Sequence, residues 1–220
     1  MLYRSGRQIW VPVTVGNLMP RQQRIVVPDI PHHITHRGNN KQDIFFSEDD
    51  YLYYLNLLQR QSTRCKVDIL GYCLMTNHVH LIIVPGSTGA MSDMIGKTHG
   101  NYTIYLNKKL EQSGHLWENR YYSCPLDDCY LITAMRYVER NPVRAGIVDD
   151  PVEYMYSSAT CHLEEDDRFG LLKSEYFGNV LRKNGLKWEE FVRQPENPRD
   201  VEHIRKHTTS GKILGIVDQR

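Results

Sequence analysis

Apolar and polar positions along the chain predict an alternation of strands and helices. Short alternating or apolar runs at residues 32–37, 67–74, 78–84 and 117–124 are typical of strands. Two stretches instead carry apolar residues at helical spacing. One begins after Ser47 and the acidic residues 48–50, and the other covers residues 91–110. The predicted order is therefore strand, helix, strand, strand, helix, strand.

This order is that of the split βαβ, ferredoxin-like fold of the α+β class. We expect an antiparallel sheet with helices on one face, which leaves the other face available to a ligand. The first helix should bury Tyr51, Leu52, Leu55 and Leu58. A further helix should begin at residues 127–128 and end near residue 140, where Pro142 stops it.

Composition divides the chain into three parts. Residues 1–24 lack a clear period and are expected to form an N-terminal arm, and residues 25–163 should form the main domain. Residues 164–220 are more charged and should form a helical and irregular extension with short helices at 174–183 and 188–192. The mildly basic tail after these helices is either a solvated extension or a contact for nucleic acid.

The overall composition restricts the class of protein only broadly. The chain has 220 residues, 40% of them hydrophobic, and a formal net charge of +1, which neither indicates nor excludes nucleic acid as a partner. No apolar run is long enough to cross a bilayer and the first residues lack the pattern of a secretory signal, so we expect a cytoplasmic protein without a membrane partner. Five cysteines without a Cys-x-x-Cys pair favour reduced thiols over a zinc site or disulfides.

The strongest chemical signal is the sequence His78-Val79-His80 at the start of the third predicted strand. Side chains alternate along a strand, so both imidazoles point to the same face and can share one metal ion. Composition alone would produce about 0.5 His-x-His pairs in a chain of this kind. The motif therefore needs support from other parts of the sequence.

The helix predicted to end near residue 140 offers a second group of candidates. Tyr137 and Asn141 are four residues apart and lie on one helix face, one turn from each other. A phenol and an amide oxygen would suit a metal already held by two imidazoles, with Asn141 as third ligand and Tyr137 as nucleophile. The alternative is a core tyrosine followed by an asparagine that caps the helix.

Four segments in order resemble a known family. Residues 75–80, with the His-hydrophobe-His (HUH) motif, and residues 34–39, 114–120 and 137–146 are similar to the corresponding motifs of single-tyrosine HUH transposases. The branch that the sequence resembles most is that of the REP-associated tyrosine transposases. The resemblance covers roughly residues 24–163.

The resemblance implies cleavage and rejoining of single-stranded DNA next to a hairpin. It assigns the metal ligands to His78, His80 and Asn141, the nucleophile to Tyr137, and the metal to Mg²⁺ or Mn²⁺. A nucleoid-associated monomer, or else a homodimer, is expected. Basic, amide and aromatic residues near these positions are candidates for DNA contacts: Arg37, Asn39, Lys41, Trp117, Arg120, Arg140 and Arg144.

Two other functions fit the same residues. The protein could bind DNA hairpins without cutting them, as a catalytically silent relative. It could also be a metal hydrolase in which water attacks and Tyr137 only packs. Covalent attachment of DNA to Tyr137 separates the first hypothesis from both alternatives.

Overall fold

The computed structural model describes residues 24–210, and the predicted arm is outside this range except for Arg24. Four strands form one antiparallel sheet in the order β2-β3-β1-β4. Their bounds are β1 His32–Arg37, β2 Val67–Met75, β3 His78–Pro85 and β4 Tyr122–Pro125. The crossover helices are α1 Glu48–Cys65 and α2 Ala90–Lys109, so the element order and the strand order confirm the ferredoxin-like prediction.

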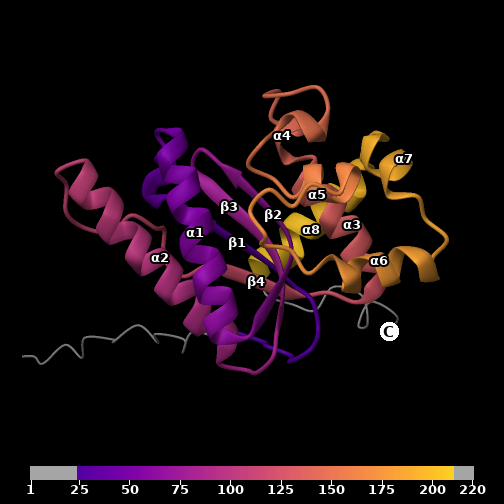
Figure 1. Cartoon of the computed structure of the whole chain (residues 1–220), viewed down its shortest axis with the longest axis horizontal. Helices are drawn as coiled ribbons and strands as arrows, with labels where there is room; N and C mark the ends of the chain where they lie inside the picture. Colours follow the sequence, from indigo (N-terminus) through magenta and orange to yellow (C-terminus); the bar gives the residue numbers. More distant parts are fainter. Residues whose placement is uncertain (1–23, 211–220) are drawn as a thin grey trace, which may run out of the picture.

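Helices α1 and α2 pack on one face of the sheet, as Figure 1 shows. The core between them and the sheet includes Ile34, Leu58, Leu81 and Tyr102. Ser47 begins α1 with a reciprocal capping box to Asp50, as the sequence pattern indicates. One predicted core position is wrong: Leu52 is 40% exposed, because the buried stripe of α1 runs through Tyr54 instead.

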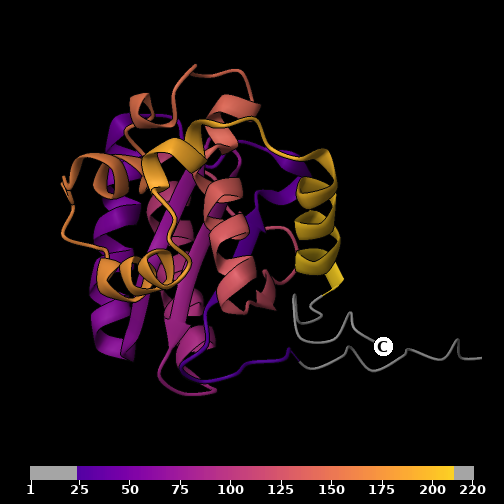
Figure 2. The same cartoon turned by 90° about the vertical axis from the view of Figure 1, so that its right-hand side faces the viewer.

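The opposite face of the sheet is also covered. Helix α3 (Asp128–Glu139) lies on it together with α6 (Ser174–Lys183), α7 (Trp188–Arg193) and α8 (Pro198–Ser210). Figure 2 shows α8 beside α3, and α8 packs against β4 and β1. Phe177, Trp188 and Ile204 share one hydrophobic core with the sheet residues Leu70 and Ile82. The face that we expected to be open to a ligand is therefore largely covered by helices that follow the fourth strand.

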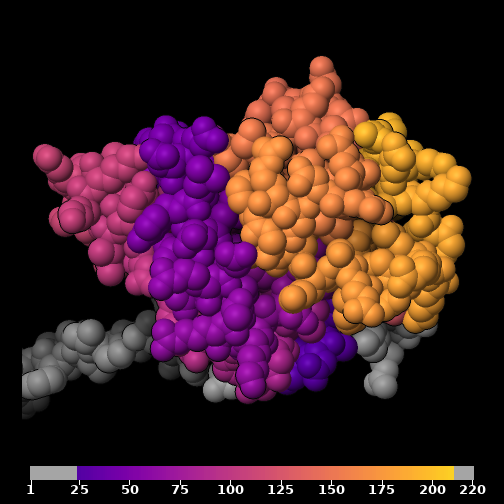
Figure 3. Space-filling view, viewed as in Figure 1, coloured from indigo at the N-terminus to yellow at the C-terminus, as the bar shows by residue number. Residues whose placement is uncertain are grey.

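The remaining short elements connect these layers. They are η1 (Asn39–Lys41), α4 (Asn141–Arg144), η2 (Pro151–Glu153) and α5 (Ala159–Glu164). In the space-filling view of Figure 3 the segment around α5 and α6 lies against α1, where the Gln59 side-chain amide donates to the Phe169 carbonyl at 2.9 Å. All five cysteines are free, in agreement with the predicted reduced thiols.

The start of one strand and the structure of the tail differ from the prediction. The strand expected at residues 117–124 begins only at Tyr122, because Asn119 adopts a left-handed conformation and Trp117 forms no more than an isolated bridge to Gly38. Helix α3 ends at Glu139, as predicted, but Pro142 lies in the first turn of the next helix, α4, where a missing N–H is tolerated. The tail contains helix α8, which buries Ile204 and Thr208 four residues apart.

Candidate functional site

The pairing of β1 with β3 decides which side chains share the face under α3. In this antiparallel register Arg37 lies opposite His78, Thr35 opposite His80, and His33 opposite Ile82. Since side chains alternate along both strands, His33, His78 and His80 point to the same side. Val79, between the two motif histidines, is fully buried in the core under α1 and α2.

Helix α3 brings Tyr137 to these histidines. The Tyr137 ring lies edge-on to His80 at a centroid distance of 5.5 Å and to His33 at 5.9 Å. His33 and His80 are stacked at 5.2 Å, and His78 contacts His80 at 5.0 Å. We call these four residues, His33, His78, His80 and Tyr137, the open cluster.

Hydrogen bonds use one nitrogen of each motif histidine and leave the other without a partner. His78 Nδ1 lies 2.6 Å from Asn77 Oδ1, so it carries the proton and donates. His80 Nδ1 lies 3.0 Å from His33 Nε2. Within residues 24–210, no hydrogen bond involves Nε2 of His78 or of His80. These two atoms are available to a ligand.

The electrostatics of the open cluster keep its imidazoles neutral at physiological pH. Burial and, to a smaller extent, the charge of Arg144 lower the pKa of His33 to about 3. Burial lowers the pKa of His78 to about 4, with contributions from Arg37 and Arg144. Burial also lowers the pKa of His80, and its histidine neighbours add to the shift. A neutral imidazole has a lone pair for a metal ion, whereas a protonated one does not.

The environment of Tyr137 is cationic on one side. The Arg144 guanidinium lies over its ring at 4.1 Å and donates to the Tyr137 carbonyl at 3.2 Å. Two contacts of 2.9 Å to the carboxylate of Glu196 hold Arg144 in this position. Within residues 24–210, the Tyr137 hydroxyl has no hydrogen-bond partner.

Asn141 follows Tyr137 by one turn, as the sequence predicts. It is the first residue of α4 and is 7% exposed. Its side-chain nitrogen is buried without a hydrogen-bond partner in the described part of the chain. Because the oxygen and nitrogen of an amide are assigned from their partners, a flipped amide would present a buried, unpaired oxygen at the same point.

These features fit a divalent ion held by two imidazoles and an amide oxygen. Residues 24–210 contain no group of three or more His, Cys, Asp or Glu side chains placed to hold a metal ion. The imidazole atoms that could contact an ion are therefore the free Nε2 atoms of His78 and His80, and the Asn141 amide is the oxygen donor that the sequence predicts. Such a set leaves coordination positions for phosphate oxygens and water, which suits Mg²⁺ or Mn²⁺ in catalysis.

Three of the predicted DNA-contacting residues lie at the end of β1 that pairs with His78, or in the turn after it. Arg37 is its partner in the sheet register, and Asn39 and Lys41 lie in the adjoining turn η1. Backbone hydrogen bonds join this turn to the one that precedes β3, with Gly38 N donating to Asn77 O at 2.8 Å. Arg37 therefore lies at the edge of the open cluster, and the Asn77 side chain donates to the Lys41 carbonyl at 3.3 Å. Asn39 instead lines a hollow with Leu106 and His115 near the end of α2.

Two other candidates form contacts within the protein. The Arg140 guanidinium donates to the Val192 carbonyl at 2.9 Å, and Arg144 is paired with Glu196, so both arginines attach the end of α3 to the C-terminal part. Arg120 is in the loop before β4, next to Tyr121.

Trp117 is on the other face of the sheet. Its ring stacks on His99 at 4.0 Å and on His36 at 4.7 Å. His99 Nδ1 lies 2.8 Å from His36 Nδ1, and Tyr54 Oη lies 2.8 Å from His99 Nε2. We call Tyr54, His36, His99 and Trp117 the closed cluster. The structure does not bring Trp117 to the histidine pair.

Sequence reasoning missed His33 and Thr208. His33 was visible only as part of a strand, and its position beside His80 depends on the pairing of β1 with β3. The strand alternation could have placed it on the same face as Thr35 and Arg37, but not next to His80. Nothing in the sequence around Thr208 indicates that it bonds to His33.

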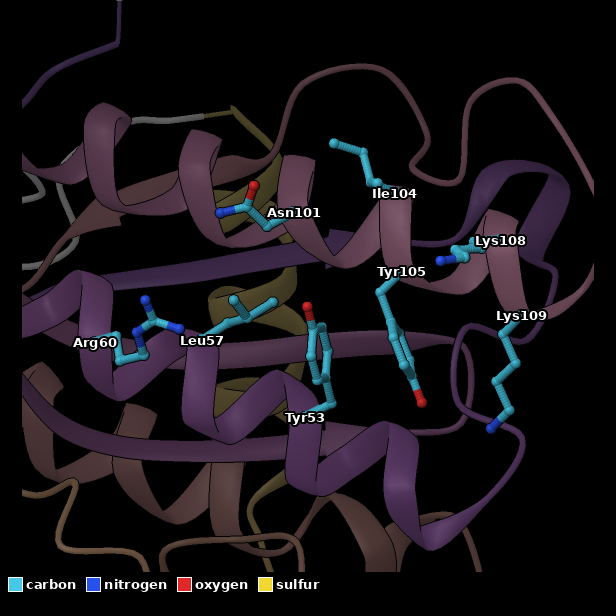
Figure 4. Close-up of a pocket in the computed structure, with 8 residues that line it drawn as sticks. All are labelled: Tyr53, Leu57, Arg60, Asn101, Ile104, Tyr105, Lys108 and Lys109. Atoms are coloured by element: carbon cyan, nitrogen blue, oxygen red, sulfur yellow. The ribbon is translucent and has the colours of Figure 1, made fainter.

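A separate groove of about 670 Å³ lies between the outer surfaces of α1 and α2. Figure 4 shows Tyr53 and Tyr105 side by side in it, with Arg60 and Lys108 at its ends. Because α1 and α2 pack on the face that holds Val79, this groove is on the opposite side of the sheet from the open cluster.

A comparison with protein-family models decides the family. The model described as "Transposase IS200 like" matches residues 26–141, which is more than half of the chain. The chain belongs to the IS200-like transposase family. The matched region of this transposase includes β1, the histidine strand, Tyr137 and Asn141, and it ends before α5, α6, α7 and α8.

One solved structure agrees with the fold of this IS200-like transposase. The structure of a REP-associated tyrosine transposase bound to a REP hairpin is 15% identical, covers 71% of this chain and 90% of its own, and has a TM-score of 0.56. A structure from Deinococcus radiodurans, assigned as a transposase, is 15% identical over 55% of this chain and 97% of its own, with a TM-score of 0.38. No curated protein matches the chain. Among residues 24–210, no helix combines the length and the apolar character needed to cross a membrane.

Proposed function

We propose that this protein is an endonuclease and strand transferase that cuts and rejoins single-stranded DNA next to hairpins. The observation that carries the proposal is the contact between the Tyr137 ring and His80 at 5.5 Å in a chain of the IS200-like family. It places a phenol beside two neutral imidazoles with unused nitrogens. The hairpin as substrate is supported by the similar structure that holds a REP hairpin.

His78, His80 and Asn141 are the proposed ligands of a Mg²⁺ or Mn²⁺ ion. When bound, the ion would act as a Lewis acid and template that polarises a phosphate oxygen. His78 is oriented for this role by Asn77, which fixes the proton on Nδ1. His80 is oriented by His33.

Tyr137 is the proposed nucleophile. Its hydroxyl oxygen attacks the scissile phosphorus and loses its proton, while the bond from phosphorus to the 3′ oxygen breaks and that oxygen gains a proton. The product is a 5′-phosphotyrosine and a free 3′ hydroxyl. The linkage keeps the energy of the phosphodiester, so attack by another 3′ hydroxyl can rejoin the strand without ATP.

The proposed DNA contacts are those next to the open cluster. Arg37 lies opposite His78, and Lys41 is in the turn that follows Arg37, where cations can hold phosphates. All residues of the open cluster come from one chain, so a monomer can form the whole site.

The test is a covalent adduct. A labelled hairpin oligonucleotide with a single-stranded flank, incubated with the protein and Mn²⁺, should give a protein–DNA band on a denaturing gel. Tyr137→Phe should abolish this band. Tyr130→Phe is the matched control, because Tyr130 is in the first turn of the same helix and contacts His203 instead.

Each other result contradicts a defined part of the proposal. An adduct that survives Tyr137→Phe and disappears in Tyr122→Phe would move the nucleophile to β4. Cleavage that yields a free 5′ phosphate and no adduct would indicate a metal hydrolase. Tight hairpin binding without cleavage in either divalent ion would identify a silent binding protein.

A further inference from the structure

His80 is the end of a chain of three hydrogen-bonding side chains that crosses from the sheet to the C-terminal helix α8. His80 Nδ1 lies 3.0 Å from His33 Nε2, and His33 Nδ1 lies 2.8 Å from the hydroxyl oxygen of Thr208. The three residues are buried, with exposed fractions of 4%, 1% and 3% for His80, His33 and Thr208. We call them the imidazole chain.

The two bonds of the imidazole chain can run in either direction. In one direction the His80 Nδ1–H donates to His33 Nε2, and the His33 Nδ1–H donates to Thr208 Oγ1. In the other, Thr208 donates to His33 Nδ1 and the His33 Nε2–H donates to His80 Nδ1. A hydroxyl both donates and accepts, so Thr208 satisfies either arrangement.

Only one direction leaves His80 able to bind a metal ion. A neutral imidazole has one proton, so donation from Nδ1 leaves a lone pair on Nε2. The reverse direction puts the proton on Nε2 of His80, an atom with no acceptor within residues 24–210. That proton would occupy the atom proposed to bind the ion, whereas metal-ligating histidines generally donate their other ring N–H to a neighbouring acceptor.

The other motif histidine, His78, carries its proton on the same ring nitrogen, Nδ1. The oxygen of Asn77 can only accept, so His78 Nδ1 donates and its Nε2 is left with a lone pair. Donation from His80 Nδ1 to His33 would give both motif histidines the same free atom. The orienting group is therefore a neighbouring amide for His78 and the chain through His33 for His80.

Thr208 connects this arrangement to a part of the molecule outside the family match. The family model ends at residue 141, whereas Thr208 is in α8, which packs against β4 and β1. Ile204, one turn earlier, is 2% exposed and belongs to the core under the sheet. The same helix face that docks α8 thus delivers the Thr208 hydroxyl to His33.

We infer that His33 and Thr208 are positioning residues, which set the tautomer of His80 so that its Nε2 faces the metal site with a lone pair. The part that concerns the metal rests on the proposed function. The tautomers themselves are a property of the protein alone and can be measured without metal or DNA.

The first experiment is ¹H–¹⁵N correlation of the imidazole rings in the metal-free protein. Wild-type protein should show His33 and His80 protonated on Nδ1. A His80 ring protonated on Nε2 would overturn the inference. In Thr208→Val, His33 Nδ1 loses its hydrogen-bond acceptor, so the His33 and His80 signals should shift toward the opposite tautomer. In the matched control Thr209→Val the signals should not shift, because Thr209 is exposed.

The second experiment is titration with Mn²⁺ alone, followed by electron paramagnetic resonance. His33→Leu should weaken Mn²⁺ binding roughly 10- to 100-fold, the usual effect of losing an orienting partner of a metal ligand. Thr208→Val should weaken it less, by about 3- to 10-fold. His33→Gln places an amide oxygen where Nε2 was and should restore most of the affinity, which a purely structural role of His33 would not predict.

The outcomes separate this inference from the proposed function. Unchanged Mn²⁺ affinity in both His33→Leu and Thr208→Val would overturn the inference even if hairpins are cut. Failure of His33→Gln to restore binding would do the same, because it would leave His33 with a purely structural role. If wild-type protein binds no Mn²⁺ or cuts no hairpin, the proposed function fails. The ring tautomers then still show whether His80 Nδ1 donates to His33 and His33 Nδ1 donates to Thr208.

Discussion

The two faces of the sheet carry two histidine clusters that differ in whether their nitrogens are all used. Strand β1 contributes to both, with His33 in the open cluster and His36 in the closed cluster. In the closed cluster the Glu118 carbonyl accepts from His36 Nε2, His36 Nδ1 accepts from His99, and His99 Nε2 accepts from the Tyr54 hydroxyl. Each ring nitrogen has a partner and each direction is fixed.

The open cluster has the same types of side chain but keeps two nitrogens free. Nε2 of His78 and of His80 have no hydrogen bond in the described part of the chain, and the Tyr137 hydroxyl likewise has none. Burial does not distinguish the clusters, since it lowers the pKa of both His36 and His78 to about 4. A buried histidine is a candidate metal ligand when one of its ring nitrogens has no hydrogen-bond partner within the protein.

The largest expected effect is the loss of DNA cleavage when a histidine of the open cluster is replaced. His80→Ala should reduce formation of the covalent DNA adduct by about 100-fold or more, because it removes the imidazole lone pair proposed to hold the ion. The far-ultraviolet circular dichroism spectrum should stay that of the folded protein. The rate of adduct formation on a gel measures the effect, and a wild-type rate would place His80 outside the reaction.

The second effect is on stability, in the closed cluster. His99→Phe leaves the Tyr54 hydroxyl and His36 Nδ1 without partners at fully or nearly fully buried positions. We expect the free energy of unfolding to fall by about 2–4 kcal/mol, as urea denaturation would show. Mn²⁺ affinity of the folded protein should be unchanged. A drop in Mn²⁺ affinity would mean that the two clusters are coupled through the sheet.

The third effect depends on pH. Burial lowers the pKa of His36 to about 4 from an ordinary value of 6.5, despite its bond to the Glu118 carbonyl, and the charge of Arg24 lowers it as well. Between these values the unfolded chain binds more protons, so stability should fall as the pH falls from 6.5 toward 4 and be flat above 6.5. The contribution of His36 is on the order of 3 kcal/mol.

Urea titrations from pH 7 to pH 4 would measure this loss. His36→Phe should lower stability at pH 7 and make the pH dependence less steep, because one titrating group is gone. His33, His78 and His80 shift in the same direction and remain in the variant, so part of the slope should persist. An unchanged slope would show that His36 is not among the groups that titrate on unfolding.

The smallest effect concerns hairpin binding. Arg37→Ala should weaken binding about 3- to 10-fold and make the salt dependence less steep by about one counterion, because the proposed contact is to phosphate. Lys108→Ala removes a cation from the groove on the opposite side of the sheet and should change the affinity less than about 2-fold. Fluorescence anisotropy at two salt concentrations measures both. A larger loss in Lys108→Ala would place the DNA on that groove.

Local patterns in the sequence were sufficient for the order of the elements and for part of the candidate site. Alternation gave β1 at its observed bounds, and Ser47 with its acidic followers marked the start of α1. The period of a strand puts His78 and His80 on one face, and helical spacing puts Asn141 one turn beyond Tyr137. These relations depend only on backbone geometry within a few residues, so the sequence contains them. The roles of these residues stay predictions.

Tertiary structure decided which of these local features meet and which nitrogens remain free. His33 and His80 are 47 residues apart in sequence, and His33 and Thr208 are 175 apart, so their bonds depend on strand pairing and on the docking of α8. Trp117, a DNA candidate from its motif, lies in the closed cluster because the chain turns at Asn119 before β4 begins. A residue's neighbours across the sheet are set by packing between distant segments, and no local period encodes them.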